Sequence, residues 1–120
     1  MKAATSTTPA DRGRSAAAEG SFSLGAGADG QLAAMGALTF VTARRAHEEG
    51  LRSLSGPAAR ALEIDFGGIT ASDSAGLAVL LDWLAAARRA GRSLRYRRLP
   101  AGLVVLARIS EVDELLERGV

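Results

Sequence analysis

The chain has 120 residues, which is enough for one compact domain and too few for two. Its net charge is only +2, from 15 basic and 13 acidic residues, so overall charge favours neither nucleic acid nor an anionic membrane as a partner. No cysteine is present, which excludes disulfides, thiolate catalysis and cysteine-based zinc sites.

The first twenty residues are rich in alanine, serine and threonine and contain no long apolar run. They match neither a signal peptide nor a membrane span, and no other segment is apolar enough for direct membrane insertion. We predict a disordered tail over residues 1–20, a single domain over residues 21–120, and a cytoplasmic location. Because aromatic residues make up only 4% of the chain, we expect an aliphatic core.

The domain is predicted to begin with a β-hairpin. Polar and apolar residues alternate over Ser21–Leu24, and a second strand is expected over Gln31–Leu38. The intervening residues 25–30 match the letters G-x-G-x-x-G of a dinucleotide site. Such a site needs a helix at its third glycine, whereas a strand pattern follows here, so a hairpin turn is favoured.

A helix from Phe40 to about Leu54 is predicted next, with Thr39 as its N-cap and Ser55-Gly56-Pro57 as its stop. Four further elements follow the pattern of apolar residues. They are a strand over Ala61–Phe66 broken by Gly67-Gly68, a helix over Ser74–Ala90, a strand around Leu94–Tyr96, and a helix over Ala101–Ile109 with a short one through Leu115 and Leu116. The order β-β-α-β-α-β-α predicts an α/β fold, a mixed four-stranded sheet with helices covering one face.

The helix after Asp73 carries two apolar stripes. Leu77, Leu80 and Leu84 face the sheet in this interpretation, whereas Val79 and Trp83 fall roughly opposite. The second stripe is either covered by neighbouring helices or exposed as a docking face for a protein. The residue pattern leaves both interpretations open.

Enzymatic chemistry finds no support in the residue pattern. His47 is the only histidine and stands beside two glutamates on a predicted helix, which is typical of a solvated surface residue. No nucleophile has a base beside it, and no metal site or cofactor is expected. The arginines between Arg88 and Arg98 fit a solvated helix end and strand face better than a nucleic-acid site, with an acidic partner or lipid headgroups as a weaker alternative.

Three segments together resemble a STAS domain. They are Gly36–Phe40, Leu62–Phe66, and the turn Asp73–Leu77 in front of an alanine- and leucine-rich helix. The resemblance covers roughly Ser21 to Gly119. This kind of domain is similar to anti-sigma-factor antagonists, to sulfate transporter tails, and to MlaB-like subunits of phospholipid-transporting ABC systems.

One position distinguishes the branches of this family. Phospho-switched antagonists typically read Asp-Ser-Ser-Gly at the turn, with the second serine phosphorylated, whereas this chain has Ala75 there. Alanine has no hydroxyl to accept a phosphate. Ser74 matches the residue that MlaB-like proteins carry before Ala-Gly-Leu, and it remains a weaker candidate for modification.

The resemblance therefore implies a non-catalytic subunit that binds and regulates the ATPase of a phospholipid-trafficking ABC transporter, in maintenance of outer-membrane lipid asymmetry. Such a subunit lies in the cytoplasm, peripheral to the inner membrane through its partner. The alternative is an antagonist that binds an anti-sigma kinase. A small-ligand site near Gly67-Gly68 is a weaker idea. The residues predicted to bind the partner are Asp73, Ser74, Ala75, Gly76, Val79 and Trp83.

Overall fold

The computed structural model describes residues 20–56 and 60–120. The predicted tail, apart from Gly20, and Pro57 of the predicted helix stop lie outside these ranges. Within them the chain forms the following elements in order: β2 (Phe22–Ala26), the 3₁₀ turn η1 (Ala28–Gly30), β3 (Leu32–Leu38), α2 (Ala43–Ser55), β4 (Ala61–Ser72), α3 (Ser74–Arg89), β5 (Ser93–Arg97), α4 (Ala101–Ile109) and α5 (Asp113–Arg118).

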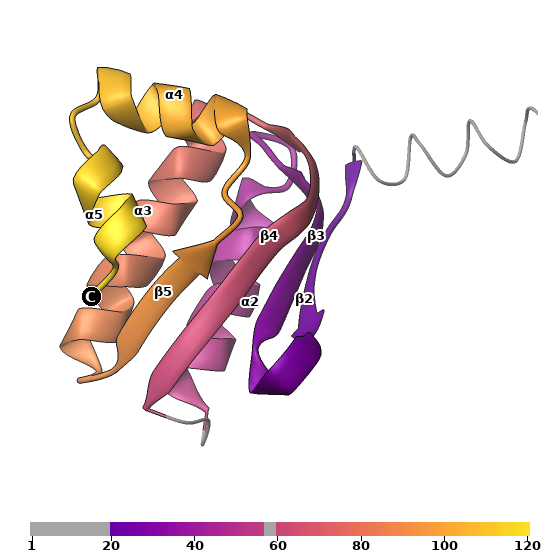
Figure 1. The fold of residues 1–120 in the computed structure, drawn as a ribbon. Coiled ribbons are helices and arrows are strands. Elements are labelled where there is room, and N and C mark those ends of the chain that lie inside the picture. Colours follow the sequence, from indigo (N-terminus) through magenta and orange to yellow (C-terminus); the bar gives the residue numbers. More distant parts are fainter. Residues whose placement is uncertain (1–19, 57–59) are drawn as a thin grey trace, which may run out of the picture.

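The four strands form one mixed sheet in the order β2-β3-β4-β5. The hairpin makes β2 and β3 antiparallel, while the crossovers through α2 and α3 make β3, β4 and β5 parallel. Helices α2 and α3 cover one face of the sheet, and α4 lies across the end where β4 passes into α3 (Figure 1). The predicted fold class, element order and hairpin are confirmed.

Strand β4 is twice as long as the predicted strand, because it continues through Gly67-Gly68 to Ser72. A side chain on Gly67 would collide with the guanidinium of Arg98, and Gly68 lies opposite Met35 where the register with β3 shifts. The two glycines thus permit close approaches inside a strand. The prediction that they end it is wrong.

The core is organised around an aromatic cluster that the composition did not predict. The Trp83 ring lies between three others, with its centroid 6.2 Å from Phe22, 6.4 Å from Phe66 and 6.5 Å from Tyr96. The Phe66 and Tyr96 rings meet edge to face at 5.2 Å. All four side chains are buried, so four of the chain's five aromatic residues serve the core.

Gly50 lets α2 approach this cluster. A methyl group at Gly50 would overlap the indole of Trp83. We expect Gly50→Ala to destabilise the domain by about 1–3 kcal/mol, measured by urea unfolding. Gly102→Ala is the matched control, because Gly102 is an exposed helical glycine whose added methyl group meets only the Ser72 hydroxyl, at 3.7 Å. It should be neutral or slightly stabilising, and equal losses for the two variants would contradict this packing.

On the open face of the sheet, Asp65 accepts two hydrogen bonds from Arg98, at 2.9 Å from Nε and 2.6 Å from Nη2. These bonds, and a third from the Gly67 backbone N–H at 2.8 Å, lower the pKa of Asp65 to about 2. A depressed carboxyl pKa stabilises the fold above the ordinary value of 3.8, and this contribution is lost as pH falls from there towards 2. An NMR titration should therefore place the Asp65 midpoint near 2.

Arg98→Gln should move that midpoint most of the way back to 3.8, because Arg98 is the largest cause of the shift. Arg97→Gln is the matched control, since Arg97 acts on Asp65 only through its charge and should raise the midpoint less. A midpoint near 3.8 in the unchanged protein would contradict the observed pairing.

Candidate functional site

Asp73 forms the N-cap of α3. Its backbone is extended, and its Oδ1 accepts hydrogen bonds from the backbone N–H groups of Ala75, at 2.9 Å, and Gly76, at 3.2 Å. These two donors have no partner within the helix, so the carboxylate satisfies them. The predicted helix start at Ser74 is confirmed.

The second oxygen of Asp73 reaches a different loop. Its Oδ2 accepts a hydrogen bond from the backbone N–H of Phe40 at 3.0 Å, and the Asp73 N–H donates to the carbonyl of Leu38 at 3.3 Å. The carboxylate therefore ties the loop between β3 and α2 to the turn between β4 and α3. Because β3 and β4 are parallel, both loops leave the same end of the sheet (Figure 1).

The loop between β3 and α2 differs from the prediction. Helix α2 begins at Ala43 instead of Phe40, and Thr42 occupies the position before it instead of Thr39. The Thr42 hydroxyl is buried and donates to the carbonyl of Ala37 at 2.8 Å while accepting from the N–H of Thr39 at 3.0 Å. This hydroxyl holds residues 39–42 in a turn, so the helix cannot start earlier.

The turn leaves two apolar side chains in solvent. Phe40 is 81% exposed and Val41 is 73% exposed. Phe40 is the one aromatic residue outside the core cluster, although the chain has only five. We define the two-loop surface as Phe40, Val41, Asp73, Ser74 and Ala75. The exposed apolar pair beside a free hydroxyl and a fixed helix end makes these two loops the candidate contact site.

Of the six residues predicted to bind the partner, the structure exposes some and buries others. Ser74 is exposed, and Asp73 and Ala75 are partly exposed. Gly76 is buried, and a methyl group there would overlap the carbonyl oxygen of Leu38, so its small size serves internal packing.

Val79 and Trp83, the remaining two residues predicted to bind the partner, do not form an exposed docking face. They are 5% and 0% exposed, because α2 and the sheet cover this side of α3. The Trp83 indole N–H donates to the carbonyl of His47 in α2 at 3.4 Å. Of the two interpretations left open by the sequence, the one in which neighbouring elements cover the second stripe is therefore correct.

Sequence reasoning missed Phe40 and Val41 because it placed them inside α2. The signal that was available is Thr42, a second residue of a type common before helices, three positions after Thr39. The buried positions of α2, which are Ala46, Gly50 and Leu54, follow a helix that starts after Thr42.

The side chains at this site can form hydrogen bonds and apolar contacts with a partner. The Ser74 hydroxyl makes no hydrogen bond within residues 20–56 and 60–120, so it is available to a partner. Over the same ranges, no group of three His, Cys, Asp or Glu side chains could hold a metal ion. No helix in the described part of the chain is long and apolar enough to cross a membrane.

Comparison with known proteins bears on the fold and the family. A family model described as "Mlab, STAS domain" matches residues 25–117. Among solved structures, the anti-sigma factor antagonist SpoIIAA in its unphosphorylated form is similar, with a TM-score of 0.55 and 11% identity over 79% of this chain and 83% of that one. At this identity the likeness shows the fold. A search of curated proteins found no match.

Proposed function

The chain belongs to the Mlab, STAS domain family, and from this we propose that it is a non-catalytic subunit that docks on the ATPase of a phospholipid-trafficking ABC transporter. The observation that carries the proposal is the exposed Phe40–Val41 pair, held beside Ser74 by the carboxylate of Asp73. In this role the protein is peripheral to the inner membrane through its partner. Binding stabilises one state of the ATPase by mass action, without chemistry on this chain.

The geometry suits a preformed contact. Asp73 fixes both loops before any partner arrives, so little conformational entropy is lost on binding. Phe40 offers the largest exposed apolar side chain on the surface, and aromatic side chains are frequent anchors of protein interfaces. Ser74 adds a free hydroxyl at the first turn of α3.

A second candidate is an antagonist that binds an anti-sigma kinase. The fold shared with SpoIIAA supports it as well as it supports the first. Ala75 argues against a phosphorylation switch at that position, since alanine has no hydroxyl. Phosphate transfer to Ser74 by such a kinase, mapped by mass spectrometry, would favour this candidate.

Ser74→Arg should abolish docking while preserving the fold. The side chain at this position is exposed and makes no hydrogen bond within residues 20–56 and 60–120, so a long charged side chain is accommodated without repacking. In a partner interface it would bring an unpaired, desolvated charge, and we expect at least a tenfold loss of affinity for the ATPase by surface plasmon resonance.

Ser74→Ala is the matched control, since it removes only the hydroxyl and should lose affinity by about fivefold or less. Circular dichroism should show the same melting temperature for both variants within about 3 °C. Unchanged affinity of Ser74→Arg would refute docking through this turn.

A further inference from the structure

A groove lies along the C-terminal half of α3, about 10 to 22 Å from Ser74 along the helix axis. It runs between α3 and α5 and has a volume of about 300 Å³. Its lining consists of Leu81, Leu84, Ala85, Arg88, Arg89, Leu115 and Val120. The two-loop surface contributes none of these residues, so the proposed docking role does not explain the groove.

The floor and walls of the groove are aliphatic. Leu84 is buried beneath it, while Leu81, Leu115 and Val120 are only partly covered and Ala85 is exposed. A hollow lined by partly exposed aliphatic side chains gains free energy when an apolar chain displaces its water. Its volume is at the lower limit of small-molecule sites, which favours one short chain over a two-chain lipid.

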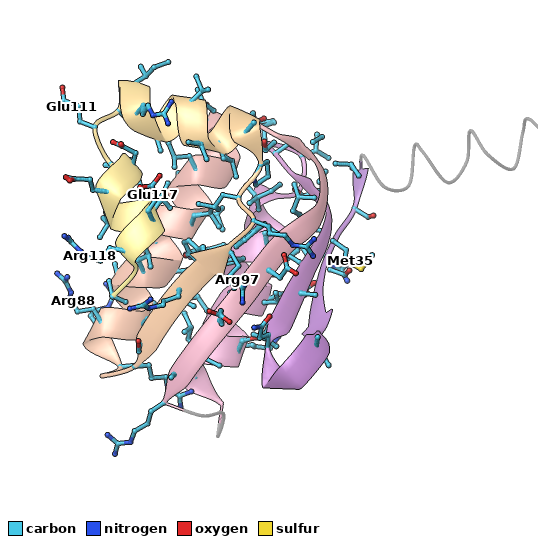
Figure 2. The ribbon with its side chains drawn as sticks, viewed as in Figure 1. Met35, Arg88, Arg97, Glu111, Glu117 and Arg118 are labelled. Carbon is cyan, nitrogen blue, oxygen red and sulfur yellow. The ribbon has the colours of Figure 1, made fainter. Side chains whose placement is uncertain are left out.

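The lining also includes two cations from the last turn of α3. Arg88 and Arg89 are exposed, and within residues 20–56 and 60–120 neither has an ion pair or a side-chain hydrogen bond. Figure 2 shows Arg88 and Arg118 pointing outward on the side of the molecule where α3 and α5 end. Cations at a helix C-terminus are favourable by themselves, but that effect does not require an apolar groove beside them.

We propose that this groove binds a single-chain anionic amphiphile, a free medium-chain carboxylate or its equivalent. The apolar chain lies against Leu81 and Leu115, and the anionic head pairs with Arg88 and Arg89. Guanidinium groups form charge-assisted, often bidentate hydrogen bonds with carboxylates. The site combines an apolar lining with a few placed charges, as ligand sites generally do.

The test is calorimetric titration of the full chain with hexanoate, octanoate and decanoate, each below its micelle concentration. Each added methylene buried in the groove should tighten binding by about fourfold until the groove is full. Decanol, which has the same chain without the charge, should bind about tenfold more weakly than decanoate. No chain-length dependence, or equal binding of decanol and decanoate, would overturn the proposal.

Three variants distinguish the contribution of the ligand's apolar chain from that of its anionic head. Arg88→Gln with Arg89→Gln should weaken decanoate about tenfold and leave decanol within twofold. Ala85→Phe should fill the groove and abolish both. Arg108→Gln, an exposed arginine in the last turn of α4, is the matched control and should change neither. Full binding by Ala85→Phe would overturn the assignment.

Two other occupants give different results. If the groove is a membrane contact, the protein binds vesicles of anionic phospholipid through Arg88 and Arg89 but does not bind decanoate. If a second copy covers it, light scattering shows a dimer that Ala85→Phe dissociates, again without decanoate binding. Either result would overturn the proposal.

Discussion

Trp83→Ala is expected to lower the melting temperature by more than about 10 °C while leaving affinity for the partner within about twofold. The indole is completely buried among Phe22, Phe66 and Tyr96, and α2 approaches it closely at Gly50. Truncating such a side chain leaves a cavity and costs about 3–5 kcal/mol, a large part of the stability of a small domain.

Stability is measured by thermal unfolding, and affinity is measured well below the melting temperature of the variant. Trp83→Phe is the matched control, because it keeps an aromatic ring in the cluster and should lose less stability than alanine. A normal melting temperature with lost affinity would contradict the buried position of Trp83 and favour the exposed docking face, which is the other interpretation left open by the sequence.

Phe40→Ala should have the reverse effect. Its ring is 81% exposed, so we expect the free energy of unfolding to change by less than about 0.5 kcal/mol. If Phe40 is an anchor of the proposed interface, its removal costs about 2 kcal/mol of binding, which is about thirtyfold in Kd. The measurement is the Kd for the ATPase partner by surface plasmon resonance or calorimetry.

Met35→Ala is the control for this prediction. Met35 is 57% exposed but lies on the open face of the sheet, away from the two loops (Figure 2). It should leave the Kd within about twofold. Equal losses for Met35→Ala and Phe40→Ala would show that the effect is not specific to the two-loop surface.

The sequence was sufficient for the fold because each element has its own local signal. Period-two alternation marks Leu62, Ile64 and Phe66, and Asp73 is a strong helix cap. The sequence does not show which helix or strand covers the apolar face of another. Whether the second stripe of α3 is exposed depends on α2, and the small residue that admits the indole, Gly50, is 33 positions away from Trp83.

Only part of the candidate site could be predicted, again because the sequence shows local signals but not tertiary packing. The acidic turn is visible in the sequence as Asp73 and Ser74, because capping is local. Its other half, Phe40 and Val41, depends on the buried Thr42 hydroxyl and on a hydrogen bond across 33 residues to Asp73. The prediction that Gly67-Gly68 ends a strand was wrong for a related reason. The guanidinium of Arg98, which is distant in sequence, packs against Gly67 and leaves no room for a side chain there.

Site-specific photo-crosslinking shows directly whether the two-loop surface contacts the ATPase of an ABC transporter. A photoreactive amino acid is placed at Phe40 and, as a control, at Met35, and the adducts formed in the host cell are identified by mass spectrometry. We expect an adduct with the ATPase subunit of an ABC transporter from position 40 and none from position 35. An adduct with an anti-sigma kinase, or an ATPase adduct from position 35 alone, would show that the two-loop surface does not dock on the ATPase.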